Sequence, residues 1–179
     1  METIQISRIE TIHADLKSIL ACRSKDQSRV NIQGVLVDKG NLGTRFVTTD
    51  GFTMAILETE RENDVMGYYT VLAETKDGIT LALDTEGMTF PDYKQVLPDY
   101  STMKQKKEGV TCGNGKGGES FSYFATTVIR MLPDSVTVNL DLLKRVFIPG
   151  QTYTVFADGP GPLAFVNCTK TFILMPMRA

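Results

Sequence analysis

One order of secondary structure occurs twice in this 179-residue chain, and it limits the possible folds more than any other feature. The first copy begins with polar and apolar side chains in alternation, as in a strand, and continues with apolar residues at helical spacing. Three runs rich in β-forming residues follow, separated by turns that contain glycine. The predicted elements are a strand at 2–6, a helix from about 11 to 23, and strands at 31–38, 44–49 and 52–59.

The second copy fills the end of the chain. Its helix has a predicted cap at Asn139, with Asp141 in the first turn. The predicted elements are a strand at 135–139, a helix from about 140 to 147, and strands at 152–157, 163–167 and 171–177. The two copies share a pattern and negligible identity. Because each copy can bury one sheet face and one helix stripe against the other, the pattern predicts a single α+β domain with two helices on one face of antiparallel sheets.

An insertion, residues 61–134, separates the first half (1–60) from the second half (135–179). It contains a hairpin-like pair at 67–74 and 78–85, and then the loop TFPDYKQVLPDY at 89–100. Prolines make this loop a poor strand or helix, yet it carries more apolar surface than a solvated loop needs. The charged and glycine-rich stretch at 104–120 is predicted to be a mobile surface loop. Its glycines do not have the GxxxxGK[ST] spacing, so nucleotide binding is not expected there.

Composition indicates an ordinary globular protein, with 42% hydrophobic and 22% charged residues. No apolar run approaches the roughly 18 residues of a membrane span, and the N-terminus lacks the pattern of a signal peptide. A soluble, cytoplasmic protein without a membrane partner is therefore expected. The net charge of −2 argues against a surface coated in basic charge for nucleic acid, although a local basic face stays open.

The sequence contains no recognisable catalytic or metal-binding motif. Cys22, Cys112 and Cys168 are far apart and odd in number, so reduced thiols are expected rather than disulfides or a zinc site. The single histidine, His13, is interpreted as a plain surface or N-terminal helix residue. Serines lack a nucleophile elbow, and carboxylates lack metal-ligand spacing. We therefore expect no catalytic residue, no metal and no cofactor. An enzyme whose residues assemble from distant positions stays open as a third hypothesis.

Three segments pair apolar side chains with glycine or proline: TTDGFTMA (48–55), FPDYKQVLP (90–98) and LMPMRA (174–179). Methionine is flexible and polarizable, which suits a surface that moulds to several partners. Met54, Met175 and Met177 could equally fill gaps in a core. The residues alone leave both interpretations open.

These three segments resemble the bacterial sliding clamp, the beta subunit of the replicative DNA polymerase. Clamp chains carry a T-D-G-[HF]-R-L-A segment, an F-P-D-Y-R-R-V-L-P segment and a terminal V-M-P-M-R. The β-α-β-β-β doublet is also the building plan of one clamp domain. In that family the three segments converge on a pocket that accepts short linear peptides of polymerases and repair proteins. The resemblance implies that the loop at 89–100 is apolar because it lines one wall of this pocket.

Carried over by position, the resemblance implies three walls. They are formed by Thr49, Gly51, Phe52, Thr53 and Met54; by Pro91, Gln95 and Val96; and by Met175, Pro176, Met177 and Arg178. Thr53 and Gln95 stand where the family has arginines, and Lys94 replaces the first arginine of the family's RRVLP run. The implied pocket keeps its apolar floor and loses part of its cationic rim.

The resemblance also concerns DNA. A family chain has three such domains, and two chains close a ring around duplex DNA, whereas one module of this size cannot surround DNA. By the family plan the helices would face DNA, and the basic residues on or after them are Lys17, Arg23, Lys25, Lys144 and Arg145. An ordinary solvated helix face is the other interpretation of these cations.

The implied partners are linear peptide motifs of DNA polymerases or repair proteins, other copies of this chain in a homo-oligomer, and duplex DNA if such an oligomer forms. Such a clamp-like protein would act as a self-assembled ring or as a competitor for partners of a full clamp. The alternative is a protein-interaction domain of the same fold that forms no ring, dimerises through edge strands, has its pocket filled by its own loop and has no role on DNA.

Overall fold

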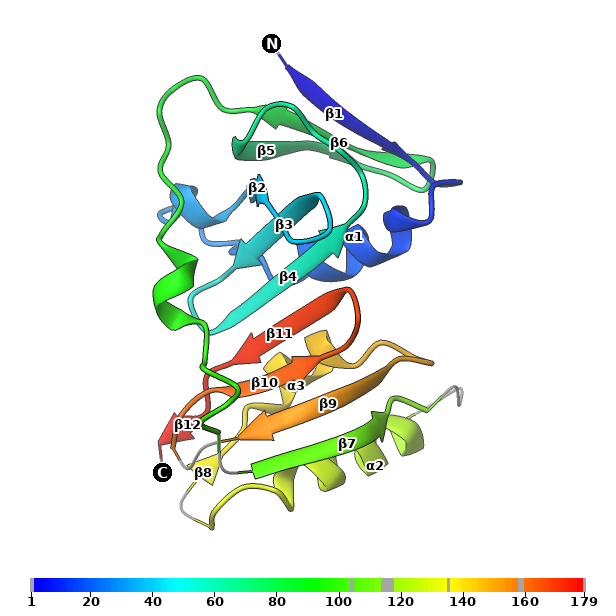
Figure 1. Ribbon diagram of the computed structural model, residues 1–179, viewed down its shortest axis with the longest axis vertical. Coiled ribbons are helices and arrows are strands. Elements are labelled where there is room, and N and C mark those ends of the chain that lie inside the picture. The colour runs from blue at the N-terminus through cyan, green and yellow to red at the C-terminus, as the bar shows by residue number, and fades with distance from the viewer. Residues whose placement is uncertain (1, 104, 114–117, 135, 158–159, 179) are drawn as a thin grey trace. The chain divides into compact units, whose positions relative to one another are not determined.

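The computed structural model describes residues 2–103, 105–113, 118–134, 136–157 and 160–178. The chain divides into two compact units, residues 1–95 and residues 96–179, and each unit has its own antiparallel sheet and helices (Figure 1). The predicted α+β class is confirmed, with antiparallel sheets.

The first unit is a six-stranded sheet in the order β1-β6-β5-β2-β3-β4 with one α-helix against it. Strands β5 and β6 follow β4 in the chain, but in the sheet they lie between β1 and β2, so this hairpin completes the sheet of the first unit. The elements are β1 (Thr3–Ser7), α1 (Ile12–Leu20), the 3₁₀ turn η1 (Val30–Ile32), β2 (Val35–Lys39), β3 (Thr44–Thr49), β4 (Thr53–Thr59), β5 (Gly67–Glu74) and β6 (Gly78–Leu83). The 3₁₀ turn η2 (Tyr93–Val96) follows, and its last residue, Val96, begins the second unit.

Helix α1 packs through the apolar stripe that its sequence predicts. Leu16, Ile19 and Leu20 are buried, and the Thr48 hydroxyl of β3 donates a hydrogen bond to the Ile19 carbonyl at 2.6 Å. His13 lies on the same buried side, so the expectation of a surface histidine is wrong. Its spacing of three residues from Leu16 explains this, because residues three apart share a helix face. Its Nε2 has no hydrogen-bond partner among the described residues.

The second unit is a four-stranded sheet in the order β11-β10-β9-β7, with α2 in contact with β7 and α3 in contact with β11. Its core is aromatic, and Phe124 of α2 packs against Phe165 of β10 with ring centroids 6.0 Å apart. The elements are β7 (Gln105–Thr111), α2 (Gly118–Ile129), β8 (Val136–Thr137), α3 (Leu140–Val146), β9 (Thr152–Ala157), β10 (Leu163–Val166), β11 (Lys170–Leu174) and β12 (Met177–Arg178). The short strand β12 pairs with β8 in a separate two-stranded sheet.

Two sequence predictions for this unit are wrong. The described residues contain a third α-helix, α2, where only two helices were expected. The predicted strand at 135–139 shrinks to β8, which pairs with β12 instead of joining the four-stranded sheet. The Asn139 cap is confirmed, because its side chain accepts a hydrogen bond from the Asp141 amide at 2.8 Å.

The stretch at 104–120, predicted as a mobile loop, contains β7 and the start of α2, so that prediction is wrong for the residues in those elements. Residues 104 and 114–117 lie outside the described residues, as do 158 and 159 of the last predicted turn. The organisation as a single domain with halves at 1–60 and 135–179 stays a prediction.

Within the described part of the chain, the three cysteines form no disulfide, and burial raises the pKa of the Cys112 thiol to about 11. No helix in the described part of the chain is long and apolar enough to cross a membrane.

Candidate functional site

The turn between β3 and β4 is held by its own side chains. The Thr49 hydroxyl donates to the Thr53 carbonyl at 2.9 Å and accepts from the Gly51 amide at 3.0 Å. The Asp50 carboxylate accepts from the amides of Phe52, at 2.9 Å, and Thr53, at 2.7 Å. Gly51 has a φ of +90°, which L side chains rarely adopt. The turn therefore has one well-defined shape, and it leaves the Phe52 ring 59% exposed.

The same segment also contains residues that are not exposed. Thr53 and Met54 are 1% and 5% exposed, and within the described residues the Thr53 hydroxyl has no hydrogen-bond partner. A neighbouring cation, which the sequence analysis did not single out, supports the turn: the Arg29 guanidinium donates to the Asp50 carbonyl at 2.8 Å. Arg29 stands 21 residues away in the chain, so no local sequence pattern connects it to the turn.

The loop at 89–100 is apolar because two of its aromatic rings are buried and attach the loop to the sheet. Phe90 and Tyr93 are buried, and the Phe90 ring packs against Tyr68 of β5 with centroids 6.3 Å apart. The Tyr93 hydroxyl donates to the Asp38 carboxylate at 2.9 Å and accepts from the Arg45 guanidinium at 2.8 Å. The loop is therefore fixed to β2, β3 and β5. Its remaining side chains at Pro91, Gln95 and Val96 are exposed.

Charges around Tyr93 reinforce this anchor. Arg45 also pairs with Glu58 of β4, and Lys94 pairs with Asp38 at 3.1 Å. Partial burial opposes ionisation of Asp38, but hydrogen bonds from Tyr93 and Lys94 outweigh it and hold the pKa of the carboxyl below its usual 3.8. Burial raises the pKa of Tyr93, so its hydroxyl keeps the proton that it donates.

The third segment follows β11. Met175 and Met177 are 39% and 47% exposed, while Pro176 is half-buried. Met177 stands opposite Thr137 in the β12–β8 pair, and the Thr137 hydroxyl donates to the Met177 carbonyl at 3.4 Å. The backbone of Arg178 pairs with Val136, and its side chain lies outside what the structure describes.

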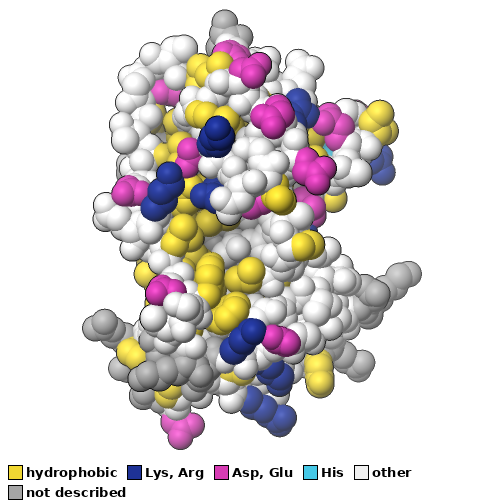
Figure 2. Space-filling model, viewed as in Figure 1, with side chains coloured by type: hydrophobic (Ala, Val, Ile, Leu, Met, Phe, Trp, Pro, Cys, Tyr) yellow, Lys and Arg dark blue, Asp and Glu magenta, His cyan; other side chains and the backbone are white. Residues whose placement is uncertain are grey.

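Each compact unit thus holds part of the predicted pocket. Residues 49–54 and 91–95 belong to the first unit, whereas Val96 and residues 175–178 belong to the second. In both units the segments expose apolar side chains from turns or strand ends, and Figure 2 shows hydrophobic side chains at the surface among charges of both signs. That the three segments form one pocket stays a prediction.

The cations predicted to face DNA differ in their surroundings. Lys17 and Lys25 are exposed, and Arg23 pairs with Glu74 at 3.2 Å. Lys144 pairs with Asp141 at 2.9 Å, and Arg145 is half-buried in the last turn of α3. Any contact of these five residues with DNA stays a prediction.

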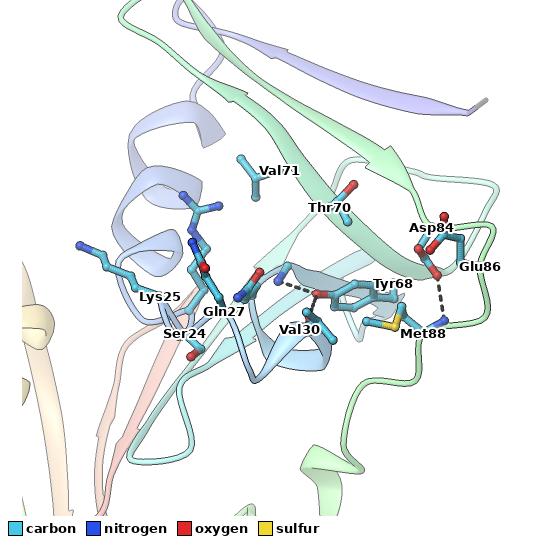
Figure 3. A pocket seen from close by; sticks show the side chains of 13 residues that line it. Ser24, Lys25, Gln27, Val30, Tyr68, Thr70, Val71, Asp84, Glu86 and Met88 are labelled. Atoms are coloured by element: carbon cyan, nitrogen blue, oxygen red, sulfur yellow. Dashed lines mark hydrogen bonds between the residues drawn. The ribbon is translucent and has the colours of Figure 1, made fainter.

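The first unit also has a hollow of about 490 Å³ beside η1 and β5 (Figure 3). Lys25 and Asp84 lie at opposite ends of it. Its polar groups are largely satisfied by the wall itself: the Tyr68 hydroxyl donates to the Val30 carbonyl at 2.6 Å, and the Asp84 carboxylate accepts from the Met88 amide at 2.8 Å. The described residues contain no group of three His, Cys, Asp or Glu side chains that could hold a metal ion.

Comparison with known proteins gives a clear result for structures and none for sequences. No family model matches the chain, and no curated protein sequence matches it. The DNA polymerase III subunit beta of Borrelia burgdorferi, solved in complex with a natural product, has a TM-score of 0.69 at 14% identity and covers 100% of this chain. The Helicobacter pylori beta clamp bound to a DNA ligase peptide has a TM-score of 0.63 at 11% identity and covers 98% of this chain. The beta subunit of Thermotoga maritima has a TM-score of 0.61 at 17% identity and covers 99%.

The chain has the sliding-clamp fold. The resemblance that three short segments indicated is therefore confirmed at the level of fold, and the likeness to the clamp structures extends over the whole chain. The chain spans 63% to 65% of the length of these clamps, so it corresponds to about two thirds of a clamp chain.

Proposed function

We propose that this chain is a sliding-clamp-like, non-enzymatic protein that binds short linear peptides of replication or repair proteins. The observation that carries the proposal is the clamp fold, which covers the full chain with a TM-score of 0.69. The Helicobacter pylori clamp supports it, because that clamp binds a DNA ligase peptide. The exposed apolar side chains of the three segments supply the kind of surface that such a peptide needs. A cytoplasmic location belongs to the same proposal.

The chemistry of the proposed pocket is mainly apolar. Phe52, Val96 and Met177 each expose 45% to 59% of their surface and can bury it against a peptide. An apolar anchor of this kind contributes roughly 1.5 to 3 kcal/mol, so a peptide with two anchors can reach micromolar affinity after the entropy cost of ordering it. With Thr53 and Gln95 in place of arginines, the proposed pocket has fewer cations, so we expect peptide affinity to depend less on salt than in a pocket that keeps both arginines.

The proposed role on DNA requires more than one copy of the chain. Strands β1 and β7 each lie at an end of their own unit's strand order, so each offers backbone groups for pairing with another chain. Such pairing can produce two kinds of assembly. One is a ring around duplex DNA, and the other is a dimer that only competes for partners of a full clamp. A sedimentation measurement of mass decides between a closed oligomer and a dimer or monomer.

Titration of a fluorescent DNA ligase peptide tests peptide binding directly, with Phe52→Ala as the informative variant. The ring is exposed, so we expect an unchanged melting temperature and peptide binding at least tenfold weaker. Leu42→Ala is the matched control, because Leu42 is 48% exposed and lies in the turn between β2 and β3, outside the proposed pocket. Equal affinities of wild type, control and Phe52→Ala would remove the β3–β4 turn from the site.

A further inference from the structure

Helix α2 has an exposed side made of hydroxyl side chains. Ser122 and Thr126 stand one turn apart, as do Tyr123 and Thr127, and Arg130 follows directly after the helix. The opposite side is core, and its buried residues are Phe124, Ala125 and Val128. From residue 120 to residue 133 the sequence contains no acidic residue, and Arg130 is its single charge.

Helix stability does not explain this choice of residues. Serine, threonine and tyrosine are weaker helix formers than alanine, glutamate or lysine, which usually fill exposed helix positions. The Tyr123 ring is 74% exposed and gains little from packing within the chain. The exposed side of α2 therefore has a composition that favours contact with a ligand over helix formation.

A lysine of β7 faces the same region. Lys107 pairs across the sheet with Val155, which is fully buried on the side covered by the helices, and residues directly opposite each other point to the same sheet face. A register shift follows between Lys107 and Val110, and such bulges redirect side chains. The preceding Lys106 pairs with Phe156, lies on the opposite face and forms an ion pair with Glu108 at 2.6 Å.

These side chains line a hollow of about 440 Å³ in the second unit. Its lining residues are Lys107, Ser122, Tyr123, Thr126, Thr127 and Arg130. Among the described residues, neither Lys107 nor Arg130 forms an ion pair, in contrast to Lys106 and Lys144. The hollow thus combines two cations without a described counter-charge, three aliphatic hydroxyls and an exposed aromatic ring.

We propose that this hollow binds a single-stranded nucleic acid. Lys107 and Arg130 neutralise phosphates, the hydroxyls of Ser122, Thr126 and Thr127 donate to phosphate oxygens, and the Tyr123 ring stacks on a base. The exposed ring favours an unpaired strand over a duplex or a phosphopeptide, because only an unpaired base offers a face for stacking. The overall charge of −2 makes this a local site rather than a coat of basic charge.

This site goes beyond the proposed peptide binding and does not depend on it. All six residues belong to β7, to α2 or to the residue after α2, and none belongs to the three segments of the predicted pocket. A chain that binds no peptide could still bind a single strand here, and the reverse also holds.

Fluorescence anisotropy with a labelled oligothymidylate at low salt tests the proposal. We expect Lys107→Ala and Arg130→Ala each to weaken binding and to reduce the log-log salt slope by about 0.7, the value for one phosphate of a single strand. Tyr123→Ala is expected to weaken binding about tenfold, and Tyr123→Phe to bind like the wild type because it keeps the stacking ring. Lys106→Ala, which removes the same charge from the other sheet face, is the control and is expected to bind normally.

Three results would overturn the proposal. They are unchanged affinity in the Lys107→Ala, Arg130→Ala double variant, equal binding of the oligothymidylate by wild type and Tyr123→Ala, and a duplex that binds as tightly as the single strand. All substituted side chains are exposed, so unchanged melting curves confirm that each variant folds. Titration of the DNA ligase peptide into the same variants separates this site from the proposed pocket, because peptide affinity is expected to stay at the wild-type value.

Discussion

Tyr93 is the residue on which the shape of the loop at 89–100 depends most. Its hydroxyl bridges Asp38 and Arg45, and the side chain is 4% exposed. We expect Tyr93→Phe to lower the free energy of unfolding by about 1 to 3 kcal/mol, because it leaves the two charged partners without the hydroxyl that joins them. Urea denaturation measures this. Tyr123→Phe removes an exposed hydroxyl and is the control, with an expected change within about 0.5 kcal/mol. Equal effects of the two substitutions would refute the anchoring role.

Because Asp38 is one of the partners of Tyr93, the stability that this contact contributes depends on pH. Its pKa is lower in the folded chain than the usual 3.8, because hydrogen bonds from Tyr93 and Lys94 outweigh its burial. A lowered folded pKa stabilises the protein above the unfolded pKa, and this stabilisation is lost as pH falls through the folded value. We expect the difference in unfolding free energy between wild type and Asp38→Asn to be largest near neutral pH and to shrink below about pH 4. A difference that stays constant to low pH would contradict the assignment.

At the scale of elements, the cap of α3 is a prediction from sequence that the structure confirms. The Asn139 side chain accepts from the Asp141 amide at 2.8 Å. We expect Asn139→Ala to lower the free energy of unfolding by about 1 kcal/mol, and Asn139→Asp to cost little because it keeps the acceptor oxygen. Chemical denaturation of the three proteins provides the measurement. If Asn139→Asp destabilises as much as Asn139→Ala, the cap is not what holds the start of α3.

Strand β12 can be removed without opening the four-stranded sheet, since among the described strands it pairs only with β8. We expect a chain that stops after Leu174 to keep most of its core and to lose binding of the DNA ligase peptide, because Met175 and Met177 are absent. Circular dichroism and peptide titration measure the two effects. Peptide binding by a folded truncated chain would show that the third segment is not part of the site.

The sequence predicts an element well where its apolar residues follow either the helical or the strand spacing clearly. Helices α1 and α3 and the strands β3, β4, β9 and β10 are examples. Helix α2 also has a helical signal in Phe124, Ala125 and Val128, but serines and threonines on its other side weaken the contrast between its faces. The order of strands could not be predicted, because β5 and β6 join β1 and β2 through non-local pairing. The pocket segments are visible as short motifs, whereas Arg29 contacts its turn only through the fold.

At the scale of the whole molecule, we expect duplex DNA binding to depend on assembly. Of the five cations predicted to face DNA, Arg23 and Lys144 already pair with carboxylates. We expect a single copy to bind duplex DNA weakly and with a steep dependence on salt, each neutralised phosphate contributing about 0.9 to the log-log slope. Anisotropy with a labelled duplex over a salt series measures this, with sedimentation on the same samples to define the oligomer. Tight binding by a monomer that ignores salt would contradict the account.

Binding of linear peptides by this clamp fold is the function that we propose. The sharpest test is calorimetric titration of the DNA ligase peptide into the wild type and into the Val96→Ala, Met177→Ala double variant, with a melting curve for each. We predict micromolar binding by the wild type and at least tenfold weaker binding by the variant at an unchanged melting temperature, because both side chains are exposed. No binding by the wild type at high micromolar peptide, or equal binding by the double variant, would contradict the claim.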